Sequence, residues 1–287
     1  MSTILLEGAP VAQALYEKAA RTSAGLQAQG VNPVVALVRV GENPADISYE
    51  NSIKKNMSKG GVSAVTAGLA QSASTEQVLE TIHTLNESPI VHGIMLFRPM
   101  PEQIDGETIR HAIHPAKDVD GITDMSLGGV FTGSGIGFAP CTAQAVIEML
   151  DYYGIDLQGR SVAVVGRSLV IGRPVSMLLL EKNATVTLCH SRTPKLMDVT
   201  KRADIVVTAT GRAKAYGPEY FAPHQTVIDV GINTDPGSGK LCGDVDFAAV
   251  STKVSAITPV PGGLGAVTTA VLVSHVVEAA KKAAERG

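Results

Sequence analysis

Short, almost unbroken apolar segments alternate with helix-like segments along most of this chain, and this alternation limits the folds it can adopt. Three such apolar segments lie in the first hundred residues, at 33–40, 62–69 and 91–97. Helical segments separate them at 48–59 and 74–88, where Ser74 and Gln77 have the spacing of a capping box. Apolar strands separated by helices predict a parallel sheet covered on both faces.

A second series of the same kind begins near residue 150. Its strands are expected at 161–166, 185–189, 204–210 and 226–231. The polar, turn-rich stretch 151–160 that precedes them indicates a domain junction. Segment 268–286 is expected to form a helix of about five turns that packs back on the first domain. We therefore expect an α/β protein with two domains, for which 287 residues suffice.

Composition narrows the class of protein further. The chain is 45% hydrophobic and 18% charged, so it can bury a sizeable core, and its net charge of −3 disfavours a general nucleic-acid binder. The first residues lack the features of a secretory signal, and no apolar run is expected to cross a membrane. The three cysteines are far apart and form no CxxC motif, which fits a reduced cytoplasmic protein without a structural zinc site.

The stretch VAVVGRSLVIGRP, residues 162–174, is the sharpest local motif. A strand is expected to end at Gly166 and a helix to begin near Gly172. Glycines there let the backbone approach a pyrophosphate, and the free N–H groups of a helix start attract its charge. The spacing differs from the usual G-x-G-x-x-G, so a strand–helix turn without a ligand stays open as the alternative.

The next predicted strand ends in TLCHSRT, residues 187–193. A site specific for NAD carries an acidic residue about 20 residues after the glycines, where it holds the ribose 2′-hydroxyl. Here there is no carboxylate, and Ser191 and Arg192 offer a hydroxyl and a guanidinium, which suit a 2′-phosphate. Arg167 and Arg173 add positive charge nearby. These residues favour NADP, although Arg192 can also be interpreted as an ordinary surface arginine.

Three further stretches are unusual. KDVDG, residues 117–121, carries Asp118 and Asp120, but a metal site is discounted because no third or fourth ligand is close in sequence. APCT, residues 139–142, is expected at a helix start. TPVPGG, residues 258–263, predicts a rigid turn whose backbone approaches a flat ligand, or else a structural bend before the last helix.

Together these motifs resemble those of the methylenetetrahydrofolate dehydrogenase/cyclohydrolase family. The resemblance covers nearly the whole chain and runs in order through VGENP, Tyr49, KDVDG, PCT, VVGRSxxxGRP, ATVTLCHSRT, IDVGIN, GDVDF and TPVPGGLG. It implies an N-terminal α/β folate domain of residues 1–145, with the helix 268–287 packed on it, and a Rossmann-like NADP domain of residues 146–267. It also implies a cleft between the domains that holds a tetrahydrofolate derivative, and a homodimer formed through the cofactor domains.

The resemblance implies roles for single residues. Tyr49 corresponds to the tyrosine that packs on the folate rings, and Asp120 to the acid that hydrogen-bonds the pterin edge, so both are expected in catalysis. The PVPGG turn would border folate through Pro259, Gly262 and Gly263. The expected NADP contacts, among which Arg192 rests on the charge argument above, are Gly166, Arg167, Ser168, Ser191, Arg192 and Ile232.

The chain departs from the family pattern after Tyr49. Family members usually carry Y-x-x-x-K, but the fourth residue here is Ile53. Four residues rotate by about 400° on a helix, back to the tyrosine's face, whereas Lys54 and Lys55 point about 140° and 120° away from it. On a regular helix we expect Ile53 at the folate and both lysines on a solvated face. A one-residue π-bulge would instead swing Lys54 inward as the catalytic lysine.

A second departure is Phe97, which replaces the glutamine of the family's V-Q-L-P-x-P and is also expected at the folate. Neither Ile53 nor Phe97 can supply the acid–base chemistry that ring hydrolysis needs. We therefore expect NADP-dependent oxidation of methylenetetrahydrofolate to methenyltetrahydrofolate in one-carbon metabolism, with weak or absent cyclohydrolase activity. One alternative is a bifunctional enzyme giving 10-formyltetrahydrofolate, with Lys54 or Arg98 supplying the missing group. Another is a non-catalytic NADP- or folate-binding regulator.

An Arg192→Ala variant tests the expected preference for NADP. NADP binding should weaken by one or two charge-assisted contacts, each about 1.5–3 kcal/mol, because the 2′-phosphate loses its guanidinium partner. NAD use should change little, because NAD has no 2′-phosphate. Steady-state kinetics with each cofactor measures both effects, and equal losses for NADP and NAD would contradict the assignment.

Overall fold

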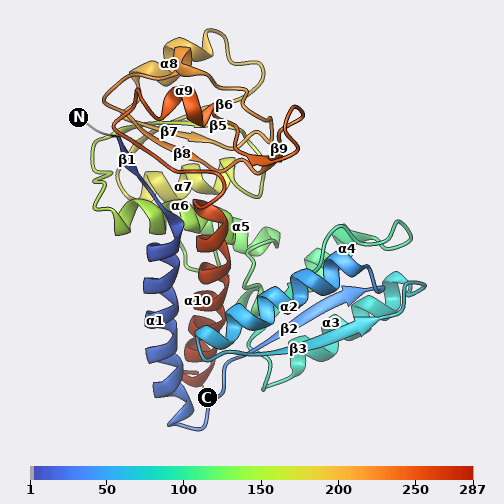
Figure 1. Ribbon diagram of the computed structural model, residues 1–287. Helices are drawn as coiled ribbons and strands as arrows, with labels where there is room; N and C mark the ends of the chain where they lie inside the picture. The colour runs from blue at the N-terminus through green and yellow to red at the C-terminus, as the bar shows by residue number, and fades with distance from the viewer. Residues whose placement is uncertain (1–2, 287) are drawn as a thin grey trace. The chain divides into compact units, whose positions relative to one another are not determined.

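The computed structural model describes residues 3–286, which form two compact units (Figure 1). The small-sheet unit comprises Gln13–Cys141 and the chain from Thr269 on, and the large-sheet unit comprises the N-terminal segment up to Ala12 and Thr142–Thr268. Each unit contains a parallel sheet with helices, so the expected two-domain α/β class is confirmed. The expected cleft concerns the relative placement of the units and stays a prediction.

The small-sheet unit is built on three parallel strands in the order β3-β2-β4, which are β3 (Ser63–Leu69), β2 (Val34–Val40) and β4 (Gly93–Leu96). Four consecutive residues of β2, from Val35 to Val38, are fully buried. Because successive side chains of a strand point to opposite faces, both faces of β2 are covered, as the apolar pattern predicts. The helices of this part of the chain are α1 (Gly8–Gln27), α2 (Pro44–Lys59), α3 (Thr75–Glu87), α4 (Gly106–Ala112), the 3₁₀ turn η1 (Pro115–Lys117) and α5 (Asp124–Thr132).

Caps decide where two of these helices begin. Ser74 and Gln77 form the expected capping box at the start of α3. The predicted start of α2 at residue 48 is wrong by four residues, because the side chain of Asn43 accepts a hydrogen bond from Ala45 N at 2.9 Å and Pro44 opens the first turn. Tyr49 therefore lies inside α2 rather than at its start.

The large-sheet unit contains six parallel strands in the order β1-β11-β8-β7-β5-β6. They are β1 (Ile4–Leu5), β11 (Ala256–Ile257), β8 (Thr226–Asp229), β7 (Ile205–Thr208), β5 (Ser161–Val165) and β6 (Thr185–Cys189). The other elements are α6 (Cys141–Tyr152), α7 (Gly172–Glu181), α8 (Leu196–Arg202), η2 (Pro218–Tyr220), the hairpin strands β9 (Asn233–Thr234) and β10 (Leu241–Cys242), and α9 (Phe247–Val250).

The first residues differ from the expected domain division, which assigned them to the folate domain. Ile4 N donates to Ser255 O at 2.8 Å and Leu6 N to Ile257 O at 2.9 Å, so β1 extends the six-stranded sheet beside β11. Leu6 is buried there. A two-residue strand leaves too weak a pattern in the sequence for its partner to be predicted.

The last helix, α10 (Leu264–Ala284), begins four residues before the predicted start. By length and composition alone it is apolar enough to cross a membrane, which the sequence argument did not expect. However, 56% of its most apolar window is buried inside the protein, as in the core helix of a soluble protein, so the feature is weak evidence for a membrane.

Candidate active site

Four of the residues singled out in the sequence gather at the carboxyl end of β4 in the small-sheet unit. Phe97 and Arg98 directly follow the strand, and the ring centres of Tyr49 and Phe97 lie 5.8 Å apart in an edge-to-face contact. Arg98 Nη2 lies 3.5 Å from Asp120 Oδ2. Tyr49 is 51% exposed whereas Phe97 is buried. The cluster thus offers an aromatic ring, a carboxylate and a guanidinium to a planar ligand.

Burial tunes the acids of this cluster. It raises the pKa of Asp120 to about 6, and the positive charge of Arg98 opposes that rise in part. Burial also raises the pKa of Tyr49, and the nearby Asp120 charge adds to the effect. Near neutral pH the Asp120 side chain is therefore mainly an ionised acceptor, and it gains a proton just below that range.

A buried contact network holds the loop before Asp120. His275 Nδ1 lies 2.8 Å from Val119 O, and Cys141 Sγ donates to the same oxygen at 3.3 Å. The ring of His275 packs on Phe138 with centres 4.9 Å apart. Burial lowers the pKa of His275 to about 4, so the imidazole is neutral and can donate to the carbonyl. Cys141 belongs to the PCT motif, but no motif in the sequence pointed to His275, which lies far away in the chain.

The lysine after Tyr49 has a defined partner. Lys54 Nζ lies 2.6 Å from Glu50 Oε1, with the lysine side chain 38% exposed. Glu50 is buried, and it also accepts hydrogen bonds from Arg39 Nε of β2 at 2.9 Å and from the hydroxyl of Thr66 in β3. Burial alone would raise the pKa of Glu50, but the hydrogen bonds from Lys54, Thr66 and Arg39 lower it to about 2.

The register of α2 decides whether Lys54 lies on the same face of the helix as Tyr49. The helix is regular from Pro44 to Lys59, so no π-bulge brings Lys54 to the face of Tyr49. Both lysines were expected on a solvated face. Lys54 instead forms an ion pair with Glu50, whereas Lys55 is exposed. Ile53 has no exposed surface and packs in the core, which differs from the expected contact with folate. The i,i+4 spacing of Glu50 and Lys54 was the signal that could have predicted this pair.

In the large-sheet unit the glycine motif forms a tight turn between β5 and α7. Gly166 has φ +122°, and a Cβ there would meet Ala209 O at 2.2 Å. Gly172 begins α7, where a Cβ would meet Gly166 O at 2.0 Å. The Ser168 hydroxyl accepts from Ile171 N at 3.2 Å and shapes the loop. Only glycine fits both positions, because a Cβ at either one would meet the chain's own backbone, and this allows the tight turn.

The loop after the neighbouring strand β6 lies at the same edge of the sheet. β5 and β6 are parallel, so Gly166 and Ser191 both follow the carboxyl ends of their strands. Arg167, Ser168, Ser191 and Arg192 are exposed. Arg192 N donates to His190 Nδ1 at 3.1 Å, and this hydrogen bond holds the backbone of the turn. These residues fit a phosphorylated dinucleotide, because the loops combine close backbone approach with exposed cations and carry no carboxylate.

The PVPGG turn and Ile232 line one cavity of about 260 Å³ within the large-sheet unit. Gly262 has φ +107°, and Ile232 is 65% exposed. From the sequence, Ile232 was expected at the cofactor and Pro259, Gly262 and Gly263 at the folate, and nothing in the sequence placed them together. Their shared cavity brings the two sets of predicted contacts side by side.

The lining of this cavity includes a buried aspartate, Asp229, that was not among the residues singled out from the sequence. Asp229 accepts hydrogen bonds from Gly231 N, Asp244 N and Val245 N at 2.9–3.0 Å. Burial raises its pKa to about 6, although these backbone hydrogen bonds oppose the rise. Asp229 lies in the IDVGIN motif and Asp244 in GDVDF, so the two motifs are joined by this contact. Among residues 3–286 no group of three or more acidic, histidine or cysteine side chains is arranged to hold a metal ion.

Two family models match the chain in the order of the two sites. Residues 6–120 match the catalytic domain of tetrahydrofolate dehydrogenase/cyclohydrolase, and residues 140–284 match its NAD(P)-binding domain. The chain belongs to the tetrahydrofolate dehydrogenase/cyclohydrolase family. The resemblance inferred from the motifs is thereby confirmed.

Individual members of the tetrahydrofolate dehydrogenase/cyclohydrolase family match end to end. The protein named bifunctional protein FolD 1 of Desulfitobacterium hafniense is 49% identical over 279 residues, which is 97% of this chain and 99% of the relative. The structure of the bifunctional FolD enzyme of Campylobacter jejuni matches with a TM-score of 0.93 at 36% identity, over 98% of this chain and 99% of that one. FolD of Trypanosoma brucei, solved with NADP and an inhibitor, matches with a TM-score of 0.90 at 30% identity over both whole chains.

The ion-pair network of Glu50 predicts a pH-dependent loss of stability in a Glu50→Gln variant. At pH 7 the free energy of unfolding should fall by on the order of 3 kcal/mol, because Arg39 and Lys54 lose a buried carboxylate. The folded-state pKa of about 2 lies below the ordinary 4.5, so this stability is present above pH 4.5 and is lost as the pH falls towards 2. Urea unfolding should therefore separate the variant from the unmodified protein more at pH 7 than at pH 3.

The matched control is Glu42→Gln, since Glu42 is exposed and has no ion pair among residues 3–286. This change should alter the free energy of unfolding by less than about 0.5 kcal/mol. An equal loss for Glu50→Gln at both pH values would contradict the network.

Proposed function

We propose that this protein is an NADP-dependent methylenetetrahydrofolate dehydrogenase that also hydrolyses its product to 10-formyltetrahydrofolate. The main support is the end-to-end match, at up to 49% identity, to relatives that are named bifunctional. Sequence reasoning favoured a dehydrogenase with weak or absent hydrolysis and kept the bifunctional enzyme as an alternative. The names of the relatives support that alternative better.

For substrate binding we propose the Tyr49 and Asp120 cluster of the small-sheet unit. The half-exposed ring of Tyr49 can stack on a planar pterin and is held by its edge-to-face contact with Phe97. The ionised carboxylate of Asp120 can accept two parallel hydrogen bonds from an amino-pyrimidine edge. Because both groups are fixed by packing, they would orient the folate before reaction, which is the main demand of hydride transfer.

For cofactor binding we propose the loops after β5 and β6 of the large-sheet unit. Gly166, Arg167 and Ser168 would hold the pyrophosphate, and Ser191 and Arg192 the 2′-phosphate. The cavity of Ile232 and the PVPGG turn would border the reacting end. When bound, NADP supplies the hydride acceptor, and the residues of the chain bind and orient it.

Hydrolysis needs a different group from the one that most members of the family carry. Water adds its oxygen to the methenyl carbon, the bond from that carbon to N5 breaks, and one proton is released. We propose that Arg98, 3.5 Å from Asp120, supports this step. A guanidinium keeps its proton, so Arg98 would act as a fixed positive charge. This charge would disfavour the cationic methenyl substrate relative to the neutral formyl product, and it would stabilise an electron-rich water oxygen as it attacks.

A dehydrogenase without hydrolysis is the second candidate. It is favoured by the full burial of Ile53 at the position of the usual lysine and by the ion pair that binds Lys54 to Glu50.

For assembly we propose a homodimer formed through the large-sheet unit, where the edge strand β6 exposes Leu188. For location we propose a cytoplasmic enzyme with three reduced cysteines.

Two absorbance assays test this function. When methylenetetrahydrofolate and NADP are added, the absorbance of the reduced-nicotinamide band should increase. If it does not increase, the remaining candidate is the non-catalytic NADP- or folate-binding regulator. Decay of the methenyl band should be faster with enzyme than without it. Arg98→Leu should slow that decay by about 10²-fold, whereas Lys54→Ala should not. No acceleration by the unmodified protein would select the second candidate, and loss of hydrolysis in Lys54→Ala alone would make Lys54 the catalytic lysine.

The carboxylate of Asp120 predicts a pH dependence of folate use. Its pKa of about 6 means that the acceptor is lost as the pH falls through that value, so kcat/KM for methylenetetrahydrofolate should fall between pH 7.5 and 5.5. Asp120→Asn should lower kcat/KM at every pH and should abolish its fall between pH 7.5 and 5.5, while NADP binding stays intact.

Asp118→Ala serves as the contrast within the same motif. Asp118 accepts hydrogen bonds from Ile122 N and Thr123 N at 2.8–3.0 Å, so its loss should lower thermal stability. Because the charge of Asp118 helps to raise the pKa of Asp120, the acid fall of kcat/KM should move to lower pH in Asp118→Ala but should persist, whereas it should disappear in Asp120→Asn. Unchanged folate affinity in Asp120→Asn would rule out its assigned role.

A further inference from the structure

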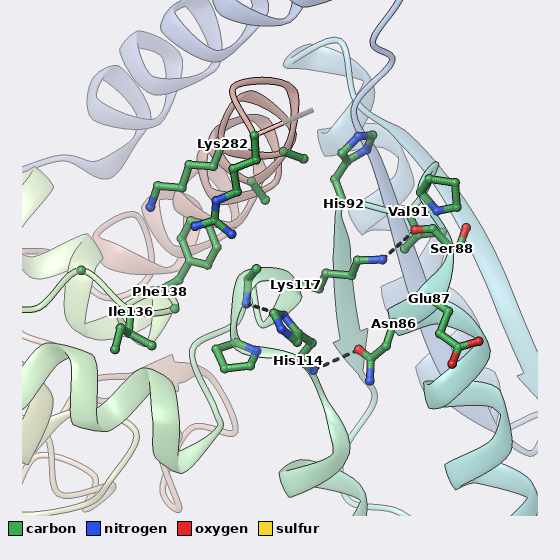
Figure 2. A pocket seen from close by; sticks show the side chains of 18 of the residues that line it. Asn86, Glu87, Ser88, Val91, His92, His114, Lys117, Ile136, Phe138 and Lys282 are labelled. Atoms are coloured by element: carbon green, nitrogen blue, oxygen red, sulfur yellow. Dashed lines mark hydrogen bonds between the residues drawn. The ribbon is translucent and has the colours of Figure 1, made fainter.

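A cavity of about 520 Å³ lies in the small-sheet unit, away from the cluster around Tyr49. It is lined by the end of α3, the segment before β4, η1, the loop after α5 and the last turns of α10 (Figure 2). His92 precedes β4, whereas Phe97 and Arg98 follow it. Because β4 has four residues at about 3.3 Å each, the cavity and the candidate active site lie at opposite edges of the sheet, roughly 13 Å apart along the strand.

The lining of this cavity is strongly cationic. Lys117, Lys282 and Arg286 line it, and none of them forms an ion pair with another of residues 3–286. Glu87 is the one acidic residue among the described residues of the lining, so the formal charge is +2 with histidines neutral. A size of this order is typical of sites for small molecules. The charge therefore favours an anionic occupant.

Packing fixes two of the cations. Lys117 Nζ donates to Leu85 O at 2.9 Å and to Ser88 O at 2.7 Å, which leaves one ammonium proton for a further acceptor. Lys282 Nζ lies 4.9 Å from the centre of the Phe138 ring (Figure 2). Burial lowers the pKa of Lys117, because removal from water disfavours the charged form, and a nearby anion would oppose that shift. Cations held in this way are better placed for binding than mobile surface lysines.

The remaining walls combine neutral polar groups with apolar surface. His92, His114 and Ser134 offer imidazoles and a hydroxyl. Ile136, Phe138, Ala279 and Ala283 form the apolar side. An inorganic ion would leave the apolar side in contact with water, whereas the apolar part of an organic ligand would cover it. We propose that this cavity binds a small organic oxyanion, a phosphate ester or a carboxylate, whose charged group contacts Lys282 and Arg286, which are four residues apart at the C-terminal end of α10, a spacing that puts neighbouring side chains on one face.

Calorimetric titration of the whole protein tests the proposal with three probes: phenyl phosphate, benzoate and inorganic phosphate. Phenyl phosphate or benzoate should bind saturably, and inorganic phosphate more weakly. Tighter binding of phenyl phosphate assigns a phosphate ester, and tighter binding of benzoate assigns a carboxylate. Absence of saturable binding of both organic probes up to 10 mM, about −2.7 kcal/mol in binding free energy, would overturn the proposal.

Variants assign the signal to this cavity, because the cofactor loops would also attract phosphate. Lys282→Ala should weaken binding at least tenfold. The matched control is Lys281→Ala, one residue away on α10, where the side chain is 47% exposed, lies 4.0 Å from Glu285 and does not line the cavity. Circular dichroism should show that both variants are folded. Arg286→Ala, which removes another cation of the lining, should also weaken binding. Equal binding by the Lys282→Ala and Lys281→Ala variants would overturn the proposal.

Discussion

The buried carboxylate of Glu50 is the interaction on which the geometry of the small-sheet unit depends. It joins α2 to β2 through Arg39 and to β3 through Thr66, and it also holds Lys54. A buried charge is tolerated only when several donors surround it, so the helix can rotate or slide only by breaking the whole network. That constraint sets the register of α2. As a result Tyr49 reaches the surface and Ile53 enters the core.

This register changes how the chemistry of the site is understood. The lysine next to the usual catalytic position is committed to a structural ion pair, and the charge nearest to Asp120 belongs to Arg98. In the proposed function, the ring of Tyr49 and the carboxylate of Asp120 would orient the folate. Ring opening would use the guanidinium of Arg98 in place of an amine. The two proposed reactions would therefore depend on different residues.

The large-sheet unit depends on backbone conformation more than on charge. Gly166 and Gly172 stand where a Cβ would meet main-chain oxygen atoms. Asp229, which lines one cavity together with the PVPGG turn, accepts hydrogen bonds from three backbone N–H groups. These contacts shape two loops at the carboxyl edge of a parallel sheet, which is where open α/β sheets bind nucleotides. In the proposed function, the exposed Ser191 and Arg192 would provide cofactor selectivity on a surface that the backbone forms.

The sequence by itself determined the alternating strands and helices, the phosphate loop, the family and most of the candidate residues, because each depends on local spacing or on a motif a few residues long. Its largest fold errors were at element ends and at β1, where a cap or a partner far along the chain decides. Only the tertiary structure decided that Lys54 pairs with Glu50, that Ile53 is buried, and that His275 and Cys141 share the carbonyl of Val119. Helical spacing predicts which residues share a face, but the sheet packed against the helix decides which face is buried.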